Sequence, residues 1–389
     1  MMPTIKSAAL LISIVLVAAF GALAGDKPTF EFDWYGYVKL DASYDQNLTS
    51  NGNYIMWVQP QLGTEDDAQF NMTHRQTRFG VVSEGKGYRE AVVNGKLEFD
   101  FYGGGTAEND AALLLRHAYL TVQSGQTQLL AGQTDDLISP LQPTTLNYGA
   151  LWNTGNIGYR RPQIRLSYRV SSNDQTDVTF SGGFFRTIGN DLTPTLSLAT
   201  EVADGSDDGT DAAVPSFQGL VDVNHKLASG TSVRFGVSGL YGRMKAEGTL
   251  GTEETYKSNA IVGHVAVDLP TGAGFSGEIQ KGANLASYLG GIDNNSTFDG
   301  VTTTGAWASF WMTPNPKMKV TAGFGLDNPD DDDIADGNRS KNRSIFGNIQ
   351  VTPIPLFTMG LELSQWKTHY KNSGAAKSFR AQTSFVLNF

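Results

Sequence analysis

Three arginines recur at every fourth position of one segment, and their spacing indicates a surface that attracts anions. Arg161, Arg165 and Arg169 occupy positions i, i+4 and i+8. Alternate side chains of an extended strand share a face, so the three guanidinium groups lie on one side of it. Guanidinium groups bind carboxylate and phosphate through charged hydrogen bonds. The spacing therefore predicts a basic wall. The alternative is a purely structural role, in which these arginines pair with neighbouring carboxylates and stabilise the sheet.

Two acidic residues and two further arginines are candidates to complete this surface. Asp135 and Asp136 open an irregular segment, residues 135–160, that ends where the arginine series begins. Arg78 lies in the polar phase opposite Phe79, and Arg116 follows an apolar run. Acidic and basic groups that face each other across a passage create a transverse field, which filters solutes by charge and dipole. We expect the two aspartates to face the basic wall in this way.

The sequence offers little support for enzymatic or metal chemistry. It contains no Cys, which excludes thiol nucleophiles and most structural zinc sites. None of its five His lies in a His-x-x-x-His pattern or a nucleophile elbow. Asp331, Asp333 and Asp336 are weak candidates for a hard cation such as calcium, but no Glu closes a twelve-residue calcium loop there. We predict no enzymatic activity, no cofactor and at most loosely bound calcium. The alternative for this acidic run, residues 327–336, is a loop that is simply solvated.

The elements that position these residues alternate with a period of two. In residues 30–45, Phe32, Trp34 and Val38 share one phase, and Asp33 and Lys39 share the other. The same alternation recurs in residues 91–101, 164–170, 233–241 and 379–389. Successive strand side chains point to opposite faces, so one face of this sheet meets an apolar medium and the other meets water. A helix would mix the two sets.

The connections indicate how many strands there are. Seven short turns alternate with eight longer polar loops, which predicts 16 strands of roughly 9–11 residues each. The expected long loops are 45–69, 103–110, 135–160, 189–214, 244–258, 282–302, 327–340 and 367–376. A soluble sandwich has strands of about 5–6 residues, and a propeller repeats every 40–45 residues or so. The pattern instead favours a closed, antiparallel transmembrane β-barrel, since a sheet in lipid must leave no unpaired edge.

The N-terminus and the overall charge limit location and partners. Residues 1–24 resemble a cleaved export signal, with Lys6, an apolar stretch and the small-x-small end Ala22-Leu23-Ala24. We therefore expect the barrel domain to span residues 25–389. Its longest apolar run is far too short for a membrane-spanning helix. A net charge of −10 argues against nucleic acid as a partner.

A barrel of this size has consequences for the segment that follows the fifth strand. About 16–18 strands enclose an aqueous lumen, whereas eight are filled by their own side chains. Residues 135–160 carry many Pro, Gly, Asn and aromatic residues without regular periodicity. We expect this segment to fold into the lumen as a constriction loop. The side chains that this fold would bury are Leu141, Leu146, Tyr148, Leu151 and Trp152.

Several short motifs together resemble a known family. They are GYVKLDASYD (36–45), TRFGV (77–81), LEFDFYG (97–103), LLRHAYL (114–120), LLAGQTDDLISP (129–140) and the terminal Phe389. They are similar to Gram-negative outer-membrane general porins, particularly DcaP-like porins, and more distantly to phosphate-selective porins. The resemblance implies a homotrimeric diffusion channel with the loop after strand five folded inside. DcaP-like members are associated with small dicarboxylates and other anionic solutes.

Together these observations predict a water-filled, 16-stranded outer-membrane channel for passive diffusion of small hydrophilic solutes, with a mild preference for anions. The expected partners are outer-membrane lipid, lipopolysaccharide, small polar or anionic solutes and two further copies of the chain. One alternative is a channel specific for dicarboxylates or phosphate. Another is a non-conducting structural or adhesion barrel.

Overall fold

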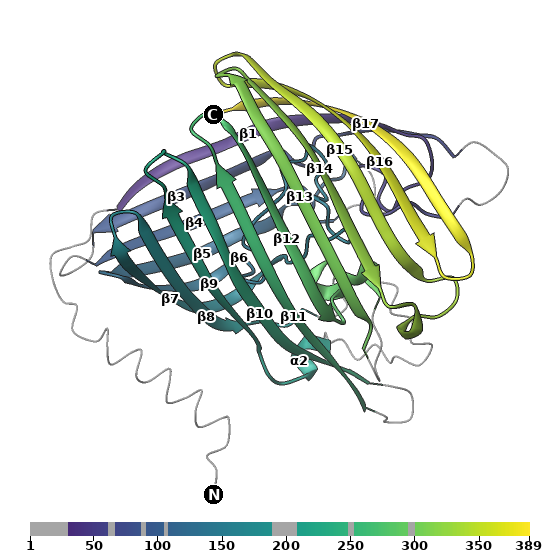
Figure 1. Ribbon diagram of the computed structural model, residues 1–389, viewed down its shortest axis with the longest axis horizontal. Coiled ribbons are helices and arrows are strands. Elements are labelled where there is room, and N and C mark those ends of the chain that lie inside the picture. The colour runs from purple at the N-terminus through teal and green to yellow at the C-terminus, as the bar shows by residue number, and fades with distance from the viewer. Residues whose placement is uncertain are drawn as a thin grey trace, which may run out of the picture.

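The computed structural model describes residues 30–60, 67–86, 91–104, 108–188, 208–247, 253–294 and 300–389. The predicted export signal, residues 1–24, lies outside these ranges. The described chain forms one antiparallel sheet that closes on itself (Figure 1). Its strands are β1 (Phe30–Asp45), β2 (Gln69–Thr73), β3 (Arg78–Lys86), β4 (Val92–Asp100), β5 (Leu114–Ser124), β6 (Thr127–Asp135), β7 (Arg160–Asn173), β8 (Thr176–Phe185), β9 (Ser216–Lys226), β10 (Ser232–Glu247), β11 (Glu253–Asp268), β12 (Ala273–Ala283), β13 (Thr302–Asn315), β14 (Met318–Pro329), β15 (Arg339–Ile354), β16 (Phe357–Tyr370) and β17 (Gly374–Asn388).

Within the described residues, helical structure is confined to short turns in the loops. They are α2 (Asp208–Asp211), η3 (Ala286–Tyr288), η4 (Gly291–Asp293) and η5 (Asp331–Asp333). No helix in the described part of the chain is both long and apolar enough to cross a membrane.

Strand β1 closes the barrel and explains its strand count. One edge of β1 pairs with β17, from Tyr37 opposite Asn388 to Asp45 opposite Arg380. Its other edge pairs with β3 along one half and with β2 along the other half. Strands β2 and β3 are therefore two parts of one position in the barrel, interrupted at residues 74–77. Seventeen strand segments thus fill sixteen positions, which confirms the predicted 16-stranded antiparallel barrel.

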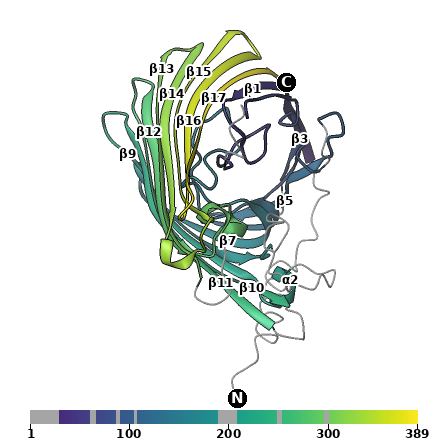
Figure 2. The same cartoon turned by 90° about the vertical axis from the view of Figure 1, so that its right-hand side faces the viewer.

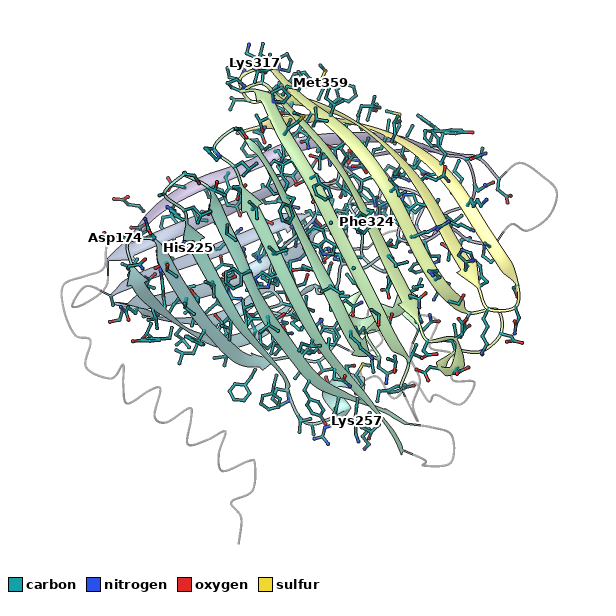
Figure 3. All side chains as sticks on the ribbon, viewed as in Figure 1. Asp174, His225, Lys257, Lys317, Phe324 and Met359 are labelled. Carbon is teal, nitrogen blue, oxygen red and sulfur yellow. The ribbon has the colours of Figure 1, made fainter. Side chains whose placement is uncertain are left out.

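The alternation of side chains has the predicted direction. The apolar phase faces outward: Trp34 is 73% exposed on the outer surface, and Phe324 points away from the barrel in Figure 3. The polar phase faces inward, where Lys39 is only 7% exposed. Adjacent residues of the same strand therefore meet different media, as a period of two requires.

Two hairpins are longer than the sequence pattern predicted. Strands β10 and β11 run to Glu247 and from Glu253, inside the expected loop 244–258. Strands β16 and β17 run to Tyr370 and from Gly374, inside the expected loop 367–376. The prediction was wrong there because polar outward side chains were taken as the end of a strand. Cross-strand hydrogen bonding continues beyond the apolar band wherever the backbone remains paired.

Three segments between strands pack against the inner face of the barrel (Figure 2). We call residues 136–159 the inner loop; the other two segments are residues 50–58 and 284–294. A hydrophobic cluster joins Ile55 and Leu151 of these segments to Trp307 and Trp366 of the wall. Of the five side chains expected to be buried in the inner loop, Leu141, Leu146, Leu151 and Trp152 are buried and Tyr148 is half-buried. The inner loop therefore packs on the inner side of the wall, and its role as a constriction stays a prediction.

Candidate functional site

Carboxylates on the β12–β16 side of the wall hold the inward segments. Glu278 of β12 accepts a hydrogen bond from the backbone N–H of Leu141, with an N–O distance of 2.9 Å. Glu362 of β16 accepts one from Leu146 N at 2.7 Å, and Asp327 of β14 accepts one from Gly291 N at 3.0 Å. The three carboxylates are buried. Their charges are thus occupied by loop amides instead of facing an open lumen.

A buried ion pair holds the two ends of the inner loop. Arg161 Nε lies 2.8 Å from a carboxylate oxygen of Asp136, and neither side chain is more than 1% exposed. Asp136 also accepts hydrogen bonds from Tyr159 N at 3.0 Å and Gln218 Nε2 at 2.7 Å. Arg161 donates to Ser287 O at 3.1 Å. These contacts make the pair a tether between the loop and the wall.

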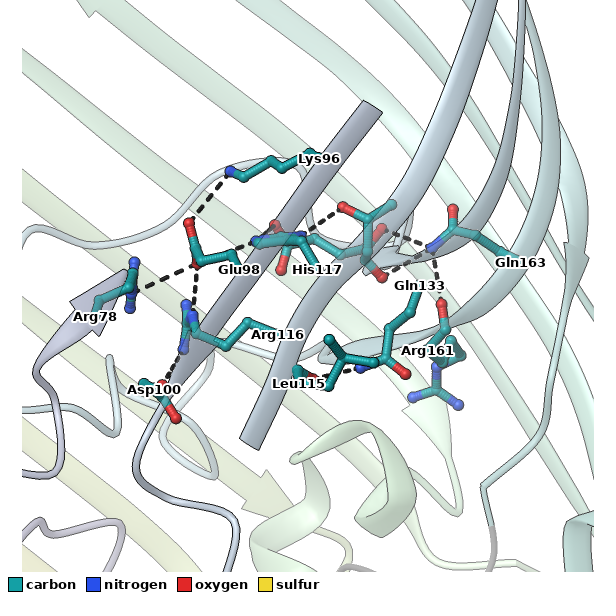
Figure 4. Close-up of polar contacts among 12 residues, drawn as sticks. Arg78, Lys96, Glu98, Asp100, Leu115, Arg116, His117, Gln133, Arg161 and Gln163 are labelled. Carbon is teal, nitrogen blue, oxygen red and sulfur yellow. Dashed lines mark hydrogen bonds and ion pairs between the residues drawn. The ribbon is translucent and has the colours of Figure 1, made fainter. Parts of the chain in front are cut away.

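A second charged cluster lies on the inner face of strands β3–β7 (Figure 4). Glu98 is its centre: Arg116 Nε donates to it at 2.7 Å, Lys96 Nζ lies at 3.3 Å and Arg78 Nε at 3.5 Å. Arg116 Nη1 also donates to Asp100 at 2.7 Å. The carboxylates therefore position three cations on one patch of the wall. From here on, the name basic wall means the set that the structure brings together and no longer the predicted series at 161, 165 and 169. Its members are Arg78, Lys96, Arg116, Arg160 and Arg165.

Arg116 reaches the lumen because of a β-bulge. In the pairing of β4 with β5, Glu98 is opposite His117 and Phe99 is opposite Leu115, so Arg116 is the extra residue. Arg116 and His117 both contact Glu98, although they are neighbours in sequence. A bulge redirects one side chain in this way. Strict alternation would have sent one of the two outward.

Two members of the basic wall have no acidic partner. Among the described residues, no carboxylate oxygen lies within 4 Å of Arg160 or Arg165. Arg165 Nη1 donates only to Gln163 Oε1, at 3.4 Å, and the Arg160 guanidinium lies 4.4 Å from the centre of the Tyr159 ring. Buried nitrogens of both arginines lack hydrogen-bond partners. Five cations thus face the carboxylates Glu98, Asp100 and Asp135, which leaves an excess of two positive charges.

The inner loop presents aromatic residues to this wall. The ring of Tyr148 stacks on Tyr102 at 3.9 Å, and Tyr54 meets Tyr148 edge-on at 5.3 Å. Burial raises the pKa of Tyr148 above its ordinary value, so its hydroxyl stays protonated. That hydroxyl donates to Asp100 at 3.4 Å and lies 3.5 Å from Arg116 Nη1. The loop and the basic wall therefore meet through a phenol and a guanidinium.

The structure distributes the predicted site residues unevenly. Arg78, Arg116 and Arg165 belong to the basic wall, whereas Arg161 is consumed by Asp136. Arg169 is 60% exposed and pairs with Asp177 near the β7–β8 turn. Asp135 is half exposed, at 4.0 Å from His117. The two aspartates therefore stand on the same wall as the arginines rather than across the lumen from them.

Two residues of the basic wall were absent from the predicted site. Lys96 and Glu98 are two residues apart on β4, so alternation alone places both side chains on the inner face, and this spacing is the signal that could have found Lys96. Arg160 lies next to Arg161 in sequence, so alternation alone assigns it to the outer face. The signal that could have found it is its position opposite Asp135, where β6 and β7 meet at the base of the inner loop.

The acidic run does not assemble a metal site. Asp333 accepts a hydrogen bond from Thr302 N at 2.8 Å, and Asp336 accepts one from Asn372 Nδ2 at 2.7 Å. Within the described ranges, no three His, Asp or Glu side chains are grouped closely enough to hold an ion. The carboxylates of Asp331, Asp333 and Asp336 therefore do not converge as a calcium site requires.

Comparison with solved structures identifies the fold. No family model and no curated protein matches the sequence. The outer-membrane channel DcaP of Acinetobacter baumannii is similar, with a TM-score of 0.71 and 19% identity over 92% of this chain and 97% of that one. An anion-selective porin from Comamonas acidovorans gives a TM-score of 0.57 and 12% identity, covering 93% of this chain and 100% of that one. OmpT of Vibrio cholerae in its trimer form gives 0.55 and 12%, covering 93% and 100%. The resemblance to outer-membrane porins, DcaP-like porins among them, is confirmed at the level of the fold.

Proposed function

We propose that this chain is an outer-membrane channel for passive diffusion of small hydrophilic solutes, with a preference for anions. The proposal rests on one observation: water can reach charged side chains on the inner face of a barrel whose outer surface is apolar. The inward side chains of Arg78 and Lys96 are 20% and 24% exposed, and that of Asp135 is 49% exposed. Charged groups are costly in lipid, so they need water on the inner side of the wall. Similar folds in outer-membrane channels support the same location.

The basic wall supports the anion preference. Its excess of two positive charges rests on Arg160 and Arg165, whose guanidinium groups have no described carboxylate within 4 Å. An anion near this surface gains Coulomb energy from the two guanidinium charges. The similar porin from Comamonas acidovorans is described as anion-selective. We place the selective region between this wall and the tyrosines of the inner loop.

The test is the reversal potential of single channels in planar bilayers under a salt gradient. A unit charge about 10 Å from a permeating ion in water contributes about 0.4 kcal/mol. Two such charges act with opposite sign on anions and cations, so after screening over a Debye length of about 10 Å we expect Arg160→Gln/Arg165→Gln to lower the anion-to-cation permeability ratio by about threefold. Arg169→Gln is the matched control, since Arg169 pairs with Asp177 away from the wall. Unchanged selectivity in the double variant would refute the role of the wall, and absence of conductance would favour a structural barrel.

A channel specific for dicarboxylates or phosphate is the second candidate, and the charges of Arg160 and Arg165, which have no described carboxylate within 4 Å, favour it. Two arginines can bind the two ends of one dianion. Succinate or phosphate at millimolar concentration would then block the chloride current of the unmodified protein. In the double variant the same concentration would have no effect. A general channel would show no block by succinate or phosphate in either protein.

We also propose a homotrimer. The outer surface of the single barrel is apolar, and the similar OmpT of Vibrio cholerae is described in a trimer form. The mass of the protein in detergent, measured by light scattering with the detergent contribution subtracted, tests this: three copies support the proposal and one copy refutes it.

A further inference from the structure

Four cationic side chains lie together on the outer surface of strands β15–β17. Arg343 is directly opposite Lys367, and Lys367 is directly opposite Lys377, in the antiparallel registers of the three strands. Lys341 is opposite His369 in the next outward row. We call Lys341, Arg343, Lys367 and Lys377 the outer basic patch. Of these four residues, only Lys367 lies in an expected loop (367–376), into which strand β16 continues.

The burial pattern shows that the patch faces outward. Ile345, two residues along from Arg343, is 68% exposed on the outer surface. Phe379, two residues along from Lys377, is also exposed. The intervening Ser344 and Ser378 are buried on the inner side. Because alternate residues of a strand share a face, Arg343 and Lys377 stand on the same outer surface as the apolar residues.

The patch carries unbalanced positive charge. Within the described residues, no carboxylate oxygen lies within 4 Å of any of its four cations. The nearby acidic run docks on the β16–β17 turn through Lys371, whose Nζ donates to the backbone oxygens of Asp331 and Ile334. Like charges directly opposite each other destabilise a sheet. A row of three cations in a chain of net charge −10 is therefore an arrangement that an external anion would stabilise.

The depth of the patch indicates which anion. Arg343 and Lys377 lie two residues, or about 7 Å, beyond the apolar row of Ile345 and Phe379. That distance separates the hydrocarbon edge of a bilayer from its headgroup layer. We propose that the outer basic patch binds the phosphate groups of a lipid headgroup, with the acyl chains over the apolar residues beneath it. Four cations match a glycolipid that carries two phosphates. This proposal requires that the barrel spans a membrane, but not that it conducts.

Native mass spectrometry of the purified protein in detergent tests the site. The probes are bisphosphorylated lipid A, the same lipid after phosphatase treatment, and inorganic phosphate alone. We expect the unmodified protein to retain bisphosphorylated lipid A and not the other two. Each cation near an anionic surface contributes about 1 kcal/mol, so Arg343→Gln/Lys367→Gln/Lys377→Gln should weaken retention by about 100-fold.

The matched control removes charge from the other end of the barrel. Lys226→Gln/Lys317→Gln alters exposed lysines near the short turns, and we expect retention within twofold of the unmodified protein. Arg343→Lys should keep most of the binding. Equal retention by the triple variant, equal loss in the control, or equal binding of inorganic phosphate would overturn the proposal. So would a change in the number of protein copies without lipid, which would make the patch an interface between copies. Heat-dependent migration on gels and unchanged conductance verify that the triple variant is folded.

Discussion

The tether between Asp136 and Arg161 gives the sharpest prediction about the channel. Asp136→Ala leaves the Arg161 guanidinium buried and without its counter-ion, because both side chains are at most 1% exposed. Removing one partner of a buried pair costs about 3–5 kcal/mol. The inner loop is also held by buried apolar side chains at about 1.5–3 kcal/mol each. These are Ile138, Leu141, Leu146, Leu151, Trp152 and Ile157.

The comparison of these two magnitudes decides what the variant should do. Six such side chains contribute about 9–18 kcal/mol, so loss of the pair cannot release the whole loop. It loosens only the base of the loop, where Asp136 accepts from Tyr159 N and Gln218. We therefore expect single-channel recordings with a small rise in conductance and a clear rise in open-channel noise. The barrel itself should remain folded.

A double variant separates loss of the tether from mere disturbance. Asp136→Leu/Arg161→Met replaces both charges by apolar groups, and such replacements are often neutral or stabilising. Its recordings should be as quiet as those of the unmodified channel. Asp135→Ala is the control, since Asp135 is half exposed and its described ion-pair contact is with His117 at 4.0 Å. A quiet Asp136→Ala channel, or a double variant as noisy as the single one, would show that the pair does not hold the loop.

Two further changes test the wall and the loop. Glu98→Gln removes the carboxylate that binds Arg116 and two other cations, so the reversal potential should shift toward anions by a fewfold change in permeability ratio. A reversal potential that stays the same would mean that this cluster is remote from the ion path. Gly325→Ala would place a methyl carbon 2.2 Å from Thr154 O of the inner loop. The loop must move away, and conductance should rise, while an unchanged conductance would show that this part of the loop lies outside the ion path.

The barrel could be predicted because a period of two and closure in lipid leave few alternatives. The phase of Trp34 against Lys39 determines which face meets lipid, and sixteen positions follow from counting turns. The inner loop was also predictable, because a long segment with Leu146 and Leu151 needs an apolar surface to cover it. Composition and periodicity are sufficient for features of this scale.

The pairing of individual charges could not be predicted from the same pattern. Whether an arginine is free or consumed depends on register, and a period of two does not specify register between strands. Arg161 and Arg165 share a face and a spacing, yet one is tied to Asp136 and the other is not. The bulge at Arg116 interrupts the alternation itself. Long-range contacts such as Glu278 with Leu141 N have no local signal.

The charge of the basic wall follows from how the inner loop is held. Backbone N–H groups of the inward segments need acceptors, and Glu278, Glu362 and Asp327 supply them on one side of the barrel. An acidic chain therefore uses much of its inward negative charge on structure. Among the cations of β7, Arg161 is tied to Asp136 and Ser287, whereas Arg160 and Arg165 keep an uncompensated charge. The anion preference that we propose therefore has the opposite sign to that expected from the net charge. Inverting this preference requires changes on the basic wall, since changes to the anchoring carboxylates would disturb the inward segments instead.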